Sequence, residues 1–534
     1  GDAGAQIATA RALEGEAAWS MAISSWRNAV TLARAAGDVA SLQEAELGLT
    51  RATRRAAMAE LVTAAIGALD EHRLDQAERI AANVRAEARA MAEPEAGVSE
   101  LGALVTKARE VGELAFAEQL ASDLVDDVPT PCGSACVARG GALADLAELV
   151  SERDPARAEQ LFAEAIKLAP GDIAVRAKRA WFFAEMGRWS DAFSAAFMGT
   201  GQSIAMAYTL VRAQAARAKF DDAVEAADRM GRNVEALGLV AAAVHRLAQV
   251  HQELLAAAPA GSEGVARLVL RRIRSLADVG LERLAMAELA TLAQFPELQR
   301  EAAWAIASPR TVRPTGADLF PLADRVKAAE QALGPTPTNE RRRRLDALAR
   351  RLAWRSTANE ATRAALARAL LADGELHEAW AMAREVDPAT AEKARVAVRG
   401  YEVLTHARQA RERADPVAQR SLGEEAAKAF DSAGVPARAL DAKLLVCEAL
   451  VASGLQKEAY RPVSLGLVAA RADGNPERIR AFEALLAKIL GKDPRALSDA
   501  ALLELAKARI DLPRPRLDSY EQTLRAHLQQ CVAL

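Results

Sequence analysis

The chain has 534 residues, of which 51% are hydrophobic and 26% are charged. This is enough apolar material for a large buried core, which excludes a disordered chain and a small scaffold held together by disulfides. The net charge of -3 argues against a surface built for nucleic acid, so a nucleic-acid partner is not expected. No apolar run reaches the roughly 20 residues that a membrane-spanning helix needs.

The first residues, Gly1 to Gly4, contain no methionine and are not followed by a basic and then an apolar segment. A signal peptide is therefore expected to be absent or already removed. We expect a cytoplasmic protein, with the periplasm after signal removal as the alternative.

A helix-turn-helix phrase recurs along the chain. In each copy a helical segment ends in glycine, and an alanine five positions later opens the next helix. The copies are Gly112 and Ala117, Gly187 and Ala192, Gly280 and Ala285, Gly374 and Ala379, Gly434 and Ala439, and Gly454 and Ala459. The glycine can adopt the left-handed conformation that ends a helix, and the alanine lets the two helices pack closely. Such a hairpin cannot bury its apolar face alone, so the copies are expected to stack around one continuous core.

Cys132 and Cys136 lie in a segment rich in Pro and Gly. Their spacing permits a disulfide, half of a metal site or a redox switch. No other Cys or His is close enough in sequence to complete a zinc site. The remaining cysteines do not extend the pair into a disulfide framework, and Cys447 falls at a helix-packing position, where a small core residue is expected.

The segment from Asp154 to Ala192 resembles the tetratricopeptide repeat (TPR). The matching small and large positions are Ala158, Phe162, Ala165, Pro170, Ala180, Phe183, Gly187 and Ala192. Residues 427–454 resemble the longer repeats of bacterial regulator and sensor proteins. The resemblance implies an all-α, right-handed superhelical solenoid of TPR-like helix-turn-helix repeats. HEAT-like or other α-solenoid geometry is the structural alternative.

In TPR proteins the first helix of each repeat lines the inner wall, where partners bind. The same inward position, counted from the turn glycines of successive repeats, is occupied by Thr106, Trp181, Arg212, Arg274, Arg368 and Glu448. Tyr208 and Arg267 are at neighbouring inward positions of the same helices. Guanidinium groups beside aromatic rings suit an acidic segment or a C-terminal carboxylate. The predicted partner-binding residues are Trp181, Tyr208, Arg212, Arg267, Arg274 and Arg368. The alternative is that these arginines pair with glutamates of the next repeat.

The longest break in the helical pattern is Ser308–Thr338, which contains five prolines. It predicts two solenoid segments, 1–307 and 339–534, joined by a Pro-rich connection, 308–338, with a short helix near Leu322–Leu333. A further helix, Leu517–Gln530, is expected to cap the end of the stack, with a separate binding tail as the alternative.

A run of four arginines, Arg341, Arg342, Arg343 and Arg344, follows the connection. It could bind an anionic partner. The alternative is a solvated helix face whose arginine stems cover apolar surface.

No pattern in the sequence indicates catalysis. Gly199-Thr200-Gly201 and Gly491-Lys492 lack the rest of a phosphate-binding loop, and the six histidines are scattered. We therefore expect no metal, no cofactor and no enzyme activity. An enzyme with a site assembled between helices is a minor alternative.

The leading functional hypothesis is a non-catalytic scaffold or adaptor that binds a protein or peptide partner, possibly an acidic one, in the groove of a helical-repeat superhelix. The alternative is a sensor or regulatory segment of a larger enzyme or transcription regulator.

Overall fold

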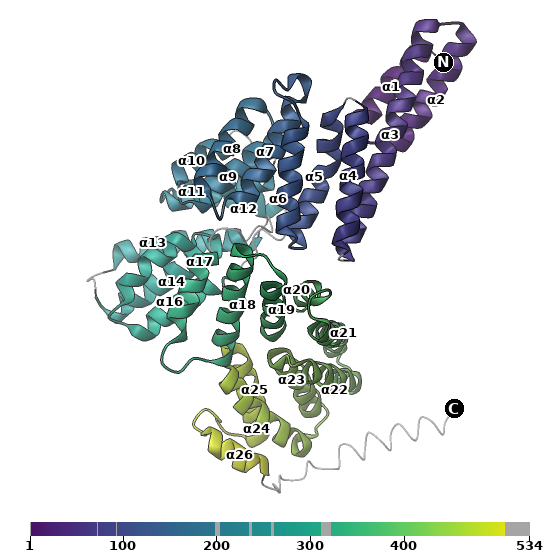
Figure 1. Cartoon of the computed structure of the whole chain (residues 1–534). Coiled ribbons are helices and arrows are strands. Elements are labelled where there is room, and N and C mark those ends of the chain that lie inside the picture. Colours follow the sequence, from purple (N-terminus) through teal and green to yellow (C-terminus); the bar gives the residue numbers. More distant parts are fainter. Residues whose placement is uncertain are drawn as a thin grey trace, which may run out of the picture. The chain divides into compact units, whose positions relative to one another are not determined.

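A computed structural model describes residues 2–71, 73–91, 93–197, 203–233, 238–257, 261–310 and 322–507. Within these ranges every regular element is a helix, and there is no strand (Figure 1). Helices that are consecutive in sequence pack against each other, hairpin after hairpin. The protein is an all-α helical solenoid, which confirms the predicted architecture at this level.

The helices belong to two compact units. The first comprises Gly1–Ala328 together with Arg355–Ala358, and the second comprises Ala329–Trp354 and the chain from Asn359 onward. The first unit contains α1 (Ala3–Gly15), α2 (Trp19–Ala36), α3 (Val39–Asp70), α4 (Leu74–Ala90), α5 (Pro94–Glu110), α6 (Leu114–Asp127), η1 (Gly133–Ala135), α7 (Cys136–Val150), α8 (Pro155–Leu168), α9 (Ile173–Glu185), α10 (Trp189–Phe197), α11 (Ile204–Ala216), α12 (Phe220–Asn233), α13 (Gly238–Ala256), α14 (Glu263–Val279), α15 (Glu282–Glu288), η3 (Leu289–Leu292) and α16 (Pro296–Ala307).

The next helix, α17 (Leu322–Leu333), confirms the short helix predicted inside the Pro-rich connection. The division between the units falls within α17, after Ala328. The second unit also contains α18 (Asn339–Ser356) as far as Trp354, α19 (Glu360–Asp373), α20 (Leu376–Ala383), α21 (Pro388–Glu412), α22 (Pro416–Ala433), α23 (Pro436–Ala452), α24 (Gln456–Asp473), α25 (Pro476–Leu490) and α26 (Asp499–Lys507). Residues 311–321 of the predicted connection and the predicted capping helix at 517–530 lie outside the described residues.

The turn glycines behave as the repeated phrase predicts. All six glycines of the phrase have a positive φ, between 72° at Gly187 and 90° at Gly374. The alanine that follows each of them is fully buried, because it lies where the second helix of the hairpin contacts its neighbours. At the six glycine positions, a residue other than glycine would have to adopt the left-handed backbone conformation at an energetic cost.

Two layers of helices build the first unit between α3 and α12. The odd-numbered helices α3, α5, α7, α9 and α11 each contact the next odd-numbered helix, and we call them the first-helix layer. The even-numbered helices between them contact one another much less. The odd-numbered helices therefore form the more tightly associated of the two layers.

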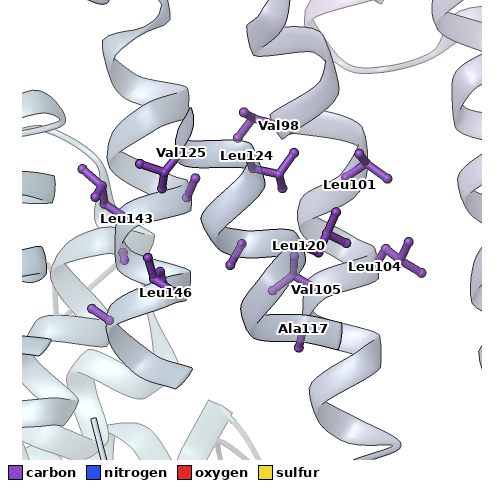
Figure 2. Packing of buried hydrophobic residues seen from close by; sticks show 14 of the residues in the cluster. Val98, Leu101, Leu104, Val105, Ala117, Leu120, Leu124, Val125, Leu143 and Leu146 are labelled. Atoms are coloured by element: carbon purple, nitrogen blue, oxygen red, sulfur yellow. The ribbon is translucent and has the colours of Figure 1, made fainter. Parts of the chain in front are cut away.

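Leucine and valine side chains of both layers interlock in the core of the first unit. Figure 2 shows this core where α5, α6 and α7 meet, with side chains that include Leu101, Leu104, Leu120, Leu124, Leu143 and Leu146. Each such side chain contributes about 1.5–3 kcal/mol when it is fully buried. Small residues set the spacing: a Cβ atom at Gly140 of α7 would come within 2.8 Å of the Ala169 Cβ atom at the end of α8.

Candidate interaction surface

Three of the predicted partner-binding residues come together on α9 and α11. The rings of Trp181 and Tyr208 lie 5.7 Å apart, centroid to centroid. The Arg212 guanidinium lies 4.9 Å from the centroid of the Trp181 ring and 5.5 Å from that of Tyr208. These are distances at which a cation is attracted to an aromatic face. The structure therefore joins Trp181, Tyr208 and Arg212 into one cluster.

A turn of the same unit covers this cluster. The Tyr208 hydroxyl donates a hydrogen bond of 2.9 Å to the carbonyl oxygen of Val279, and Arg212 Nε donates one of 2.9 Å to that of Gly280. Both carbonyls belong to the C-terminal end of α14, where the helix dipole favours a cation. All three side chains of the cluster are buried, so the place expected for a partner is taken by the α14–α15 turn.

Arg212 also forms an ion pair with Glu185 of α9, with 2.7 Å between Nη1 and Oε1. Both side chains are only 2% exposed. Removing two charges from water is costly, so such a pair needs further hydrogen bonds and contacts. The Gly280 carbonyl and the Trp181, Trp189 and Tyr208 rings supply them. The pair thus fastens α9, α11 and the end of α14 together.

The other predicted arginines lie elsewhere and are exposed. The exposed fraction of the side chain is 66% for Arg267, 40% for Arg274 and 58% for Arg368. Each is paired with a carboxylate: Arg267 with Glu263, Arg274 with Glu301, and Arg368 with Asp387. The Arg274–Glu301 pair joins α14 to α16, which is the pairing with a glutamate of a following helix that the sequence left open as the alternative. Glu263 lies four residues before Arg267 on the same helix, and the partner of Arg368 is an aspartate. Partner binding by these three residues stays a prediction.

The arginine run at the start of α18 is mostly engaged within the second unit. Arg341 donates to the Ala332 carbonyl at 2.7 Å, Arg343 pairs with Asp473, and Arg344 lies 3.1 Å from Asp373. Arg342 has an exposed side chain. Binding of an anionic partner by the run stays a prediction, and Arg342 is the member most accessible to one.

A network of charges on the first-helix layer was missed by sequence reasoning. Arg109 of α5 pairs with Glu148 of α7 at 2.5 Å, Glu148 lies 3.5 Å from Lys178 of α9, and Lys178 pairs with Asp145 of α7. We call these four residues the first-helix network. All four side chains are partly exposed. Between the preceding two helices of the first-helix layer, Arg55 of α3 pairs with Glu100 of α5 at 3.2 Å.

Burial and charge act against each other in this network. Burial raises the pKa of Asp145 above its usual value, and the attraction of Lys178 offsets only part of that effect. Burial alone would lower the pKa of Lys178, but the nearby charges of Asp145 and Glu148 outweigh it, so this pKa is raised. Lys178 therefore stays protonated at neutral pH and attracts both carboxylates.

One signal could have revealed the network. Lys178 precedes Trp181 by three residues on α9, so the two lie on neighbouring parts of one helix face. The inward positions singled out in the sequence, including the neighbouring Tyr208 and Arg267, do not include the helical neighbours that carry these charges. The pairing of opposite charges on consecutive first helices is visible only when those neighbours are aligned as well.

The cysteine pair is joined in the structure. Cys132 and Cys136 form a disulfide with their Cα atoms 4.9 Å apart, and Cys447 is a buried free cysteine, as predicted for a core residue. Among the described residues no group of three or more His, Cys, Asp or Glu side chains is placed to hold a metal ion. Nor does any described helix have the length and apolarity needed to cross a membrane.

No protein-family model matches the chain, and no curated protein does. Among solved structures it is similar to a protein described as a "Circular tandem repeat protein with novel repeat topology and enhanced subunit contact surfaces", with 15% sequence identity, 94% of this chain and 96% of that chain covered, and a TM-score of 0.14. The helical-repeat architecture is given by the stacked hairpins of the described residues themselves.

Proposed function

We propose that the protein is a non-catalytic scaffold or adaptor that binds a segment of a protein partner along the first-helix layer, from α3 to α9. The observation that supports this most is the first-helix network. It presents partly exposed cations and carboxylates on three consecutive first helices, α5, α7 and α9. A layer of this kind can contact an extended segment at several points at once.

The arrangement of the layer suits such a role. Stacked helices curve towards the side on which they approach each other more closely, and here that is the first-helix layer. Ion pairs between neighbouring helices hold the charged groups in place before a partner arrives. Little conformational entropy is then lost on binding. The TPR-like, right-handed form of the solenoid remains part of this proposal and is supported by the residues of the repeat phrase.

The chemistry of the network also bears on the partner. An acidic segment would meet Asp145 and Glu148 as well as Lys178 and Arg109, so repulsion would cancel part of the attraction. A segment that carries both signs of charge can pair with all four residues. We therefore favour a mixed-charge segment over a purely acidic one.

The test is affinity purification of the intact chain with quantification of the proteins that co-purify. An Arg109→Gln/Lys178→Gln variant removes both cations of the network. The matched control, Arg395→Gln/Arg420→Gln, removes two exposed arginines that pair with Glu392 and Glu424 of their own helices. Partners retained by wild type and control but lost by the network variant support the proposal. Equal recovery by all three folded proteins would show that the network is not the binding surface.

A further inference from the structure

The connection between α6 and α7 carries a second feature of chemical interest. Cys132 lies in this connection, Cys136 is the first residue of α7, and the short helix η1 separates them. We infer that this pair is a reversible dithiol–disulfide site that exchanges with small-molecule disulfides. The inference is independent of the proposed binding surface.

Exposure separates these two cysteines from the buried one. Cys132 and Cys136 are both partly exposed, whereas Cys447 is 0% exposed and burial raises the pKa of its thiol to about 12. The thiolate is the reactive form of cysteine, so Cys447 is inert at neutral pH. Of the cysteines that the structure describes, only the pair can meet a dissolved reagent.

The ends of the connection are held without help from the disulfide. Arg139 Nη1 donates to the carbonyl oxygens of Val125, at 2.8 Å, and Val128, at 2.5 Å, at the end of α6. Val128 and Ala135 are both buried in the core. Reduction can therefore open the S–S bond while the two thiols stay close together. That proximity is what makes closure of the disulfide favourable again.

The two sulfurs have different roles in the exchange. Cys132 packs against the hydrophobic core, whereas Cys136 begins the 15-residue helix α7, whose N-terminal dipole stabilises a thiolate. The Cys136 thiolate attacks a small disulfide such as oxidised glutathione, forming a mixed disulfide and releasing one glutathione thiolate. The Cys132 thiolate then attacks the Cys136 sulfur, forms the internal disulfide and releases the second glutathione. Two electrons pass from the cysteines to the small disulfide, and the thiol protons go to solvent.

The test is to equilibrate the full-length Cys531→Ser protein with buffers of reduced and oxidised glutathione over a wide range of ratios. Acid quenching, alkylation and peptide mass spectrometry then give the oxidised fraction at each cysteine. The inference requires Cys132 and Cys136 to change together, as a two-electron couple, within the range of the buffers, while Cys447 stays reduced. A pair that stays fully oxidised or fully reduced in every buffer would overturn it.

Single variants test the assignment of roles. With Cys132→Ser, Cys136 should trap the mixed disulfide with glutathione, and should do so about tenfold faster than Cys132 does in the Cys136→Ser protein. Circular dichroism confirms that both variants are folded. Equal rates, or faster reaction at Cys132, would refute Cys136 as the attacking thiol.

Discussion

Arg212 of α11 and Glu185 of α9 form an ion pair in which neither side chain is more than 2% exposed. Such a pair is stable only as long as both partners are present, because a single buried charge has no water to solvate it. The carbonyl of Gly280, 68 residues further along the chain, also accepts a hydrogen bond from Arg212. Three helices therefore depend on one guanidinium.

Replacing Arg212 with alanine should destabilise the first unit by about 3–5 kcal/mol, because Glu185 is left buried without its cation. Hydrogen–deuterium exchange in α9, α11 and the end of α14 should rise together. Arg267→Ala is the control, because this exposed arginine should change stability by less than about 0.5 kcal/mol. An Arg212→Met/Glu185→Leu protein should be more stable than Arg212→Met alone. If it is less stable, the buried charge is not the cause of the loss.

Gly474 ends α24 with φ of 90°, and a Cβ atom there would collide with the side chain of Thr338. Gly474→Ala should therefore destabilise the second unit by more than the roughly 1–2 kcal/mol expected for the left-handed backbone alone. Gly434→Ala is the matched control, since φ is 75° there and a Cβ atom would meet nothing within 4 Å. Urea unfolding of the three proteins measures the difference. Thr338→Gly should recover part of the stability in the Gly474→Ala background but none in the Gly434→Ala background.

Asp127 at the end of α6 links stability to acid pH. Burial by itself raises the pKa of this carboxyl group, but hydrogen bonds from Arg85 and Arg89 outweigh burial, so the pKa is held below its ordinary value of 3.8. A carboxyl group whose pKa is lower in the folded state stabilises the fold above the unfolded-state pKa. That contribution is lost as the pH falls below about 4, through the folded-state pKa.

Thermal unfolding of wild type and Asp127→Asn, measured between pH 7 and pH 2.5, checks this dependence. The variant should be less stable at pH 7, and the two melting temperatures should converge as the pH falls. Asp493→Asn is a useful comparison, because Asp493 is exposed and its pKa is lowered chiefly by Arg495, two residues away. A gap between wild type and Asp127→Asn that is the same at every pH would contradict the prediction.

Arg343 and its neighbour Arg342 should respond differently to replacement. Arg343→Ala removes a partner of the buried Asp473, which among the described residues then pairs with Arg478 alone, so a loss of about 1.5–3 kcal/mol in the second unit is expected. Arg342→Ala should change stability by less than about 0.5 kcal/mol. If the run binds an anionic partner, Arg342→Ala should weaken that binding and flatten its dependence on salt. Binding to heparin-coated resin in a salt gradient gives the readout.

Local patterns were enough to predict the hairpins. The positive φ of Gly280 and the burial of Ala285 follow from residue types that suit a helix end and a close helix contact. The bounds of α17 follow from prolines on either side of a helical pattern. Each of these features depends on residues that are close together in the sequence.

Contacts between distant segments could not be predicted in the same way. The repeat alignment gave Trp181 and Arg212 the same inward position and Tyr208 a neighbouring one, but the α14–α15 turn that covers them lies about 70 residues further on. Arg343 and Asp473 are 130 residues apart. A repeat alignment compares each unit with the average unit, so it carries no information about which turn folds back on which face.

The first-helix network has a consequence for the order of the repeats. Glu148 lies between Arg109 on one side and Lys178 on the other, so the α7–α8 hairpin supplies the negative charge that its two neighbours require. A chain that lost this hairpin would bring two cations face to face, and a chain that doubled it would bring carboxylates together. Although the helices resemble one another in shape, these charges suit the α7–α8 hairpin to its place between α5 and α9.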